Sequence, residues 1–292
     1  ATSTMTTATL GPRGSFSEEA ALMRTASDHL IAMSSFPALV SAVETGLADE
    51  AVIPIENSIE GSVSTTLDLL IHETSLRIAG ELVLPVRQFL VTIPGARIED
   101  IKVVTSHPQG LGQCRRFLDR CLPGVEEVAA LSTSLAVQEV SEGGDPTRAA
   151  IGTRRAAEIY GGAILAHDIQ DAKSNVTRFV VLAREDAPPT GDDKTSIGFR
   201  VKENVPGVLH WILTSIADEG LQMTKIESRP TKGWLGEYVF LVDIEGHRVD
   251  PRVSNVLDEI AEKSLMLKIF GSYPRFPFES LRAALDAGQP LD

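Results

Sequence analysis

Short apolar runs alternate with amphipathic stretches along the first 180 residues of the chain. The apolar runs predict strands, and the stretches with helical spacing between them predict helices. Strands are expected over 6–10, 50–57, 101–106, 125–131, 149–152, 163–166 and 177–183, and helices over 37–46, 65–74, 110–121, 134–143 and 153–161. Repeated strand–helix units predict an α/β domain built on a parallel sheet with helices on both faces.

The segment 76–95 interrupts this alternation, because it is extended over its whole length and has no helix inside it. We expect two strands here, and a crossover between two lobes that each repeat the strand–helix pattern. Ligands in such folds bind beyond the carboxyl ends of the strands, often between lobes. The pattern therefore predicts a site between the lobes.

A new pattern begins after "REDAPPTGDD", a stretch of prolines, glycine and acids that predicts a linker. Strands are expected over 194–201, 221–230, 236–246 and 265–274, with helices over 205–220 and 253–264. This βαββαβ order is that of the ferredoxin-like arrangement, which often serves as a ligand sensor. The expected division is a catalytic domain over 6–184, a linker over 185–193, a regulatory domain over 194–274 and a tail over 275–292.

Composition narrows the function classes. The 292 residues carry a formal net charge of −13, which argues against a nucleic-acid partner because phosphates require a basic surface. No run of 18 apolar residues is present, so we expect no membrane span, and without a recognisable signal peptide we expect a cytoplasmic protein. Cys114 and Cys121 lie two helical turns apart, too far to bridge, and are expected to be free thiols.

Four polar loops each follow a predicted strand: "GPRGSFS" (11–17), "PIENSIEGSV" (54–63), "SHPQG" (106–110) and "LSTS" (131–134). Each loop alone is explained by a turn or a helix cap; Ser15 and Glu18, for example, have capping-box spacing. Together the loops are rich in hydrogen-bond donors, and His107 has no second His or Cys at metal-ligand spacing. The set predicts a metal-free site for anions, carboxylates above all. Thr177 and Arg178, polar residues at the start of an apolar strand, are a fifth element of this site.

The segments "LGPRGSFSEEAA", "PIENSIEGSV", "SHPQGLGQC" and "NVTRF" resemble the four signature blocks of prephenate dehydratase. Two later segments, "ENVPGVL" and "KIESRP", resemble the effector motifs of the ACT domain that is fused to that enzyme. All six occur in the expected order between positions 10 and 230. The resemblance implies an α/β fold: a two-lobed catalytic domain like a type II periplasmic binding protein, followed by a ferredoxin-like ACT domain.

The resemblance implies that prephenate is converted to phenylpyruvate, water and carbon dioxide without a cofactor. It assigns Thr177 to the leaving hydroxyl and Arg178 to a substrate carboxylate. Glu56 is an alternative proton donor if burial keeps it protonated, and the choice between Thr177 and Glu56 stays open. The expected substrate-binding residues are Asn57, Ser58, Ser15, Ser106 and Phe179, the last packing beneath the site.

The ACT motifs imply regulation by L-phenylalanine bound between two ACT domains, and hence a homodimer or homotetramer. The residues that match are Asn204, Pro206, Gly207, Val208 and Leu209 at a helix start, and Glu227, Ser228, Arg229 and Pro230 on a strand. The helix N-terminus is expected to meet the effector carboxylate, and Glu227 or Asn204 its ammonium group. "PGVL" departs from the family's G-A-L-V, so inhibition is expected but activation by another amino acid stays open.

Three other functions fit parts of the pattern. An arogenate dehydratase carries out the same chemistry on a substrate with an amino group. A non-catalytic solute-binding protein shares the two-lobed architecture, and an amino-acid sensor shares the ACT domain. Turnover of prephenate would distinguish a prephenate dehydratase from the solute-binding protein and the amino-acid sensor.

Overall fold

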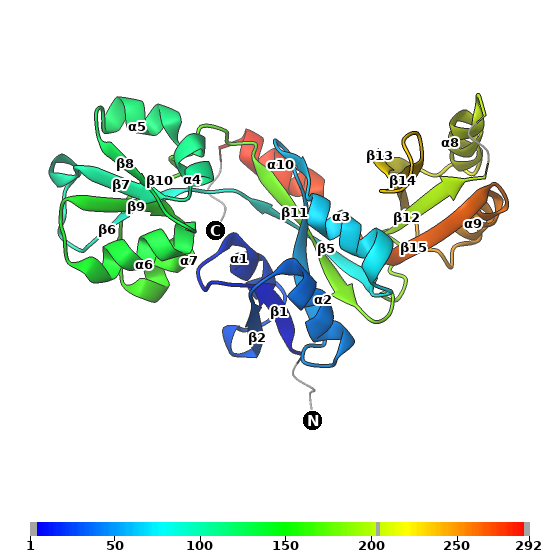
Figure 1. The fold of residues 1–292 in the computed structure, drawn as a ribbon, viewed down its shortest axis with the longest axis horizontal. Coiled ribbons are helices and arrows are strands. Elements are labelled where there is room, and N and C mark those ends of the chain that lie inside the picture. The colour runs from blue at the N-terminus through cyan, green and yellow to red at the C-terminus, as the bar shows by residue number, and fades with distance from the viewer. Residues whose placement is uncertain (1–4, 203–204, 289–292) are drawn as a thin grey trace.

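The computed structural model describes residues 5–202 and 205–288, which form three sheets (Figure 1). Two sheets belong to the two lobes of an α/β unit, and the third is formed by strands between Asp193 and Pro274. This arrangement confirms the predicted fold class. Within the described ranges, no helix is long and apolar enough to cross a membrane.

The first lobe is built on a sheet with strand order β2-β1-β3-β11-β5. Its strands are β1 (Thr7–Leu10), β2 (Leu30–Met33), β3 (Glu50–Asn57), β5 (Arg77–Pro85) and β11 (Val176–Ala183), with the short β4 (Gly61–Ser62) paired to β3. Helix α1 (Phe16–Leu22) covers one face of the sheet. Helices α2 (Phe36–Glu44) and α3 (Ser64–Asp68), together with the helical turn Leu69–Glu73, cover the other.

The second lobe has strand order β10-β6-β9-β7-β8. Its strands are β6 (Phe89–Thr92), β7 (Val103–Ser106), β8 (Glu126–Ala129), β9 (Arg148–Gly152) and β10 (Ala163–His167). Its helices are α4 (Pro108–Gln113), α5 (Arg115–Cys121), α6 (Thr133–Gly143) and α7 (Arg154–Tyr160). The chain crosses between the lobes twice, over 85–89 and again over 167–176 (Figure 1). The predicted two lobes and crossover are thereby confirmed.

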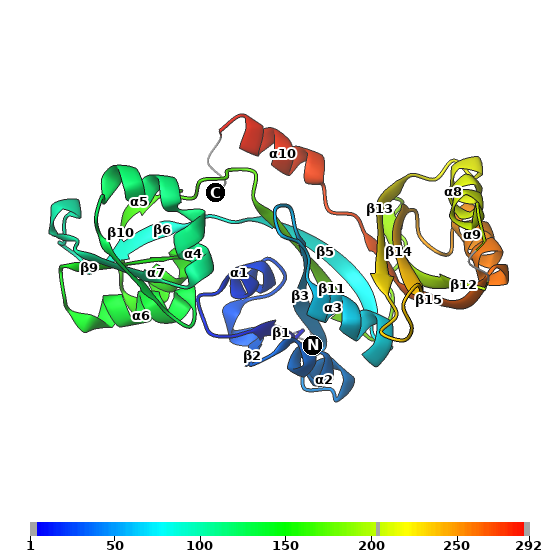
Figure 2. The same ribbon diagram turned by 45° about the horizontal axis from the view of Figure 1, so that its top comes forward.

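The third sheet has order β13-β14-β12-β15 and carries α8 (Val208–Asp218) and α9 (Pro251–Glu262) on one face. Its strands are β12 (Asp193–Val201), β13 (Met223–Pro230), β14 (Tyr238–Glu245) and β15 (Ser264–Pro274). Every neighbouring pair is antiparallel, as the βαββαβ order predicts. Helix α10 (Phe278–Asp286) then runs back toward the second lobe (Figure 2).

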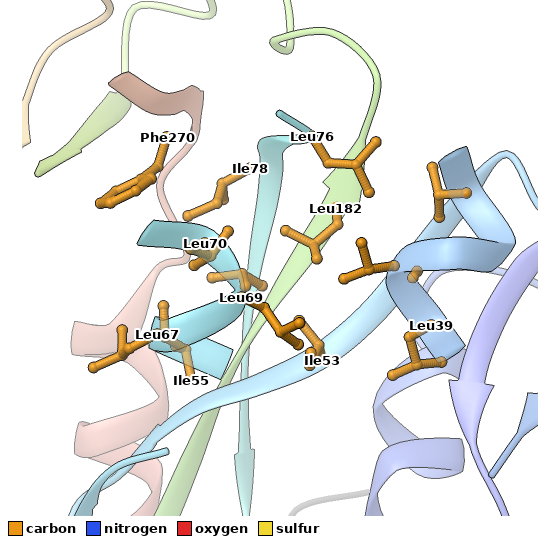
Figure 3. Packing of buried hydrophobic residues seen from close by; sticks show 14 of the residues in the cluster. Leu39, Ile53, Ile55, Leu67, Leu69, Leu70, Leu76, Ile78, Leu182 and Phe270 are labelled. Carbon is orange, nitrogen blue, oxygen red and sulfur yellow. The ribbon is translucent and has the colours of Figure 1, made fainter. Parts of the chain in front are cut away.

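We call this third sheet the ACT sheet, after the domain that its sequence motifs resemble, and its helix-free face packs against the first lobe. Phe270 and Tyr273 of β15 and Leu241 of β14 belong to the same buried cluster as Ile53 and Leu182 of the first lobe. Figure 3 shows Phe270 beside the first-lobe side chains of this cluster. The ACT sheet is therefore docked through a shared apolar core, and not merely tethered by the linker.

The structure corrects four local predictions. The lobe sheets are mixed, because the strands flanking the crossovers return antiparallel to their neighbours. The edge strand β2 was not predicted. The helix expected over 110–121 is interrupted at Cys114, whose backbone is not helical. The helix expected from 205 begins only at Val208, because Gly207 precedes it with φ of 86° and leaves Pro206 outside. Both cysteines are free, as expected.

Candidate active site

The parallel strands of the two lobes point their carboxyl ends at one another. Strands β1, β2 and β3 are mutually parallel in the first lobe, and β7, β8 and β9 in the second. The loops beyond them meet: the Thr153 hydroxyl donates to the carbonyl of Gly14, and Arg155 Nε lies 3.0 Å from Glu18 Oε1. A third bridge joins the Gln109 side-chain amide to the Glu60 carboxylate. The junction between the lobes is thus where ligands of such sheets bind.

All four predicted polar loops lie at this junction. Loop 11–17 contacts the start of α7, where a Cβ on Gly14 would lie only 2.8 Å from Ala156. Loop 58–60 contacts α4 through Glu60. Loop 131–134 caps α6 through Ser132 and lies beside the 106–110 loop, where a Cβ on Gly110 would touch Thr133. Backbone donors from both lobes therefore converge on one region.

Thr177 is the second residue of strand β11 and pairs with Asn57, the last residue of β3. The side-chain oxygen of Asn57, Oδ1, accepts the backbone N–H groups of Ile59 and Glu60. The side-chain nitrogen, Nδ2, is therefore turned toward β11. That nitrogen donates to Thr177 Oγ1 at 3.1 Å and to Asn175 Oδ1 at 2.7 Å. Because the threonine oxygen accepts, its own proton is available for donation, and no acceptor for it is found among the described residues. Thr177 is a half-buried, oriented hydroxyl donor.

Arg178 and Glu56 face away from Thr177. A β-bulge at Ile55 separates the pairs Arg178–Glu56 and Phe179–Pro54, so Glu56 points to the same side as Arg178. That side is the ACT sheet: Arg178 bonds Asp243 of β14, and Glu56 Oε2 lies 3.1 Å from Lys225 Nζ of β13. This geometry does not support Arg178 as the clamp for a substrate carboxylate or Glu56 as the proton donor, and both assignments stay predictions. Both side chains contact residues of the ACT sheet at the domain interface.

The other predicted substrate-binding residues divide into structural and accessible groups. Ser106 is fully buried, donates to the carbonyl of Ile151 and lies against Gly110 of α4, so the structure gives it a supporting role beneath that helix. Ser15 caps α1 through the N–H of Glu18, as its spacing predicted. Ser58 is exposed, and its hydroxyl joins the 58–60 loop to the start of β11. Phe179 lies two residues after Thr177 on the same face of β11, and its side chain is buried under α1.

A pair of glutamines at the junction escaped the sequence analysis. Gln88, on the first crossover, is almost fully buried and donates from its side chain to Gln113 Oε1 at 2.8 Å. The side-chain oxygen of Gln88, Oε1, has no hydrogen-bond partner in the described part of the chain. Gln113 ends α4 and is half-buried, which leaves its amide nitrogen as a donor beside the crossover. The signal was available, because Gln113 closes the quoted block "SHPQGLGQC".

Glu19 is a second group that sequence spacing did not reveal. It lies on α1 against the start of α7, and burial raises the pKa of its carboxyl from 4.5 to about 7, although it accepts the backbone N–H of Arg155. The folded protein therefore binds a proton that the unfolded chain releases between about pH 4.5 and 7. The stability contributed by this group is fully present below pH 4.5 and is lost as the pH rises through 7.

The free energy of unfolding of the Glu19→Gln variant is expected to exceed that of the wild type by about 3 kcal/mol at pH 8, because the substitution removes a buried charge. At pH 5 the gain should shrink to less than about 1 kcal/mol, since both side chains are then largely neutral. Urea denaturation at the two pH values measures the difference. Glu139→Gln, on the exposed face of α6, is the control. An equal gain at both pH values would contradict the assignment.

The predicted effector residues lie on two faces of the ACT sheet. Ser228 lies on the α8 side of β13, since it pairs with Phe240, whose side chain packs under the helices. Glu227 points the other way and accepts the Ser62 hydroxyl at 2.6 Å, and Arg229 lies 3.3 Å from Asp68. This geometry does not support a contact of Glu227 with an effector ammonium on the α8 side, and that contact stays a prediction. Asn204 lies outside the described residues.

The comparisons with known proteins agree with this geometry. The family model of prephenate dehydratase matches residues 7–187. A bifunctional chorismate mutase/prephenate dehydratase of Aquifex aeolicus is 42% identical over 91% of this chain and 72% of its own length. An arogenate dehydratase/prephenate dehydratase of Arabidopsis thaliana is 40% identical over 90% of this chain and 70% of its own.

Two solved structures extend the similarity to the whole fold. Prephenate dehydratase of Arthrobacter aurescens in complex with L-Phe has a TM-score of 0.82 and 36% identity, covering 97% of this chain and 98% of its own. A protein named GqqA, described as a novel type of quorum quenching acylase, has a TM-score of 0.83 and 32% identity, covering 94% and 99%. The signature blocks, the lobe junction and these matches lead to one conclusion: the chain belongs to the prephenate dehydratase family.

Proposed function

We propose that this chain converts prephenate to phenylpyruvate by a decarboxylating dehydration, the step that supplies the carbon skeleton of L-phenylalanine. The observation that carries the proposal is the Thr177 hydroxyl, whose oxygen accepts from Asn57 and whose proton is free to be donated at the lobe junction. Prephenate loses carbon dioxide and a hydroxyl group together, and its ring becomes aromatic. The protein has to hold the substrate and assist the departing hydroxyl.

The Thr177 hydroxyl supplies this assistance as a hydrogen-bond donor. A hydroxyl that accepts a hydrogen bond from an amide is polarised, so it donates more strongly through its own proton. As the carbon–oxygen bond of the substrate breaks, negative charge grows on the departing oxygen, and the donor stabilises it. Thr177 need not lose its proton completely, because a water molecule can complete the transfer.

The two substrate carboxylates require donors other than Arg178. The N-terminus of α6, an eleven-residue helix, and the backbone of loop 11–17 present N–H groups at the junction. Gln113 adds a side-chain amide. Neutral donors of this kind hold an anion in a protein whose net charge of −13 would otherwise repel it.

Turnover decides between prephenate and arogenate, since a relative of this chain is named for both substrates. We expect phenylpyruvate, followed by its absorbance in alkali, to form from prephenate at a kcat/KM at least about tenfold above that for arogenate. The reverse ratio would make the chain an arogenate dehydratase. Absence of turnover on both substrates would contradict the proposed function and favour a solute-binding role.

L-Phenylalanine is proposed as the effector, with its carboxylate at the start of α8 and its site completed by a second ACT domain. This requires at least a homodimer. The proposal is supported by the accessible backbone around Gly207, by Ser228 on the same side of the sheet, and by the phenylalanine complex of the Arthrobacter aurescens relative. Cytoplasmic location is proposed with it, as for a biosynthetic enzyme.

Ser228→Ala is expected to raise the phenylalanine concentration for half-maximal inhibition by about tenfold, because one hydrogen bond to a charged ligand is lost. Activity without phenylalanine should stay within about twofold of the wild type, since Ser228 faces away from the catalytic lobes. Steady-state assays across a phenylalanine series measure both values. Ser254→Ala on α9 is the matched control. Unchanged inhibition in Ser228→Ala would remove this residue from the effector site.

A further inference from the structure

We propose that Arg178 is a positioning residue that couples the ACT sheet to Thr177, its neighbour on β11. The inference deepens the proposed function and rests on it, because it assigns to this arginine the transmission of effector binding to the catalytic hydroxyl.

The Arg178 guanidinium is bonded by partners from both domains. Only 8% of the residue is exposed. Nε donates to Glu81 Oε1 of β5 at 2.7 Å, Nη1 to Asp243 Oδ2 of β14 at 3.0 Å, and Nη2 to Tyr273 Oη of β15 at 2.9 Å. Each of the three nitrogens thus donates one hydrogen bond, one to the first lobe and two to the ACT sheet. The guanidinium is held in place by both domains at once.

A wider set of charges encloses this arginine at the domain interface. Glu81 also accepts from Lys194 Nζ at 2.9 Å, and Glu56 lies 3.6 Å from Arg178 Nη1. Three cations face three carboxylates, namely Arg178, Lys194 and Lys225 with Glu56, Glu81 and Asp243. Separating such a buried network leaves charges without partners, which is strongly unfavourable. A shift of the ACT sheet must therefore carry β11 with it or exchange one set of partners for another.

Strand β13 connects this network to the effector side of the sheet. Lys225 pairs with Asp243 across β13 and β14, and its ammonium reaches Glu56 on the catalytic side. Ser228 lies three residues further along the same strand, on the opposite face. Displacement of β13 by an effector therefore acts on Asp243, then on Arg178, and then on the adjacent Thr177. This is a contiguous chain of packed, charged groups between the two sites.

The test uses two mild variants on the ACT side, because removal of Arg178 itself would leave buried carboxylates unpaired and risks unfolding. Tyr273→Phe deletes one acceptor of the guanidinium, and Asp243→Asn weakens another. Tyr238→Phe, the same change at an exposed position of β14, is the control. Prephenate turnover is measured with and without phenylalanine for all three and for the wild type.

Coupling predicts that both variants keep KM for prephenate within about threefold, while the factor by which saturating phenylalanine reduces kcat/KM falls at least about fivefold. Tyr238→Phe should behave as the wild type. Wild-type inhibition in both variants would overturn the proposal. So would a rise in KM of about 100-fold with inhibition unchanged, which is the behaviour of a substrate clamp.

Hydrogen exchange keeps the test independent of turnover. Phenylalanine should change amide exchange within 176–183 in the wild type, and this change should be lost in Tyr273→Phe and Asp243→Asn. If prephenate and arogenate are both left unconverted, the proposed function fails and the exchange result alone decides the coupling. A wild type whose β11 exchange is insensitive to phenylalanine overturns it.

Discussion

Replacing Thr177 with alanine is expected to lower kcat by about 10²–10³ and to leave KM for prephenate within about threefold. The substitution removes the hydroxyl that Asn57 orients, so the departing substrate oxygen loses its donor. Binding should persist because, in the proposed function, backbone donors of other loops at the lobe junction hold the substrate carboxylates. Steady-state assays of phenylpyruvate formation over a series of prephenate concentrations measure kcat and KM.

Thr177→Ser is the matched control, because it keeps the hydroxyl and removes only a methyl group. We expect it to retain at least about a tenth of wild-type kcat, since a serine hydroxyl can accept from Asn57 in the same position. Circular dichroism should show that both variants are folded. An alanine variant with unchanged kcat would exclude Thr177 from the chemistry and direct attention to Gln113.

Gly271→Ala is expected to destabilise the docking of the ACT sheet by roughly 3 kcal/mol and to lower the melting temperature by about 6–10 °C. Strand β15 approaches β5 so closely that a Cβ on Gly271 would lie 2.2 Å from the carbonyl oxygen of Ile78. Neither atom belongs to a flexible side chain, so the two backbones must move apart. The shared core around Phe270 would open with them.

Thermal unfolding and protease cleavage within the linker 185–193 measure this effect. The linker should be cut faster in Gly271→Ala, because its ends are held by the docked sheet: Ala187 N–H donates to the Ser272 carbonyl. Gly143→Ala is the control, because the added methyl group there meets no neighbour. A Gly271→Ala protein with the melting temperature and cleavage rate of the wild type would show that the close contact is not maintained in solution.

Local patterns were sufficient for most of the fold. Apolar runs and helical spacing placed nearly all strands and helices, because these periodicities are local properties of the chain. The pattern failed for β2, a four-residue edge strand, and at Cys114, where one amphipathic stretch is divided into two helices. Short elements carry too little periodic signal to be distinguished from loops.

The candidate site was predicted in its loops and in Thr177 and Asn57, but not in the direction of every side chain. Thr177 and Arg178 are adjacent in the chain, and both were expected to meet the substrate. Successive side chains of a strand point to opposite faces, so only one of them can face the lobe junction. Which one does so depends on how β11 pairs with its neighbours.

The sequence by itself determined two α/β lobes and a ferredoxin-like βαββαβ domain, and it predicted an anion site around the Thr177 hydroxyl, because local periodicity and short motifs carry that information. Only the tertiary structure decided that Arg178 and Glu56 serve the domain interface. The reason is the bulge at Ile55, which turns Glu56 to the side of Arg178, and the ACT sheet that meets them there. Strand register and domain docking arise from contacts between residues distant in sequence, and no local pattern encodes them.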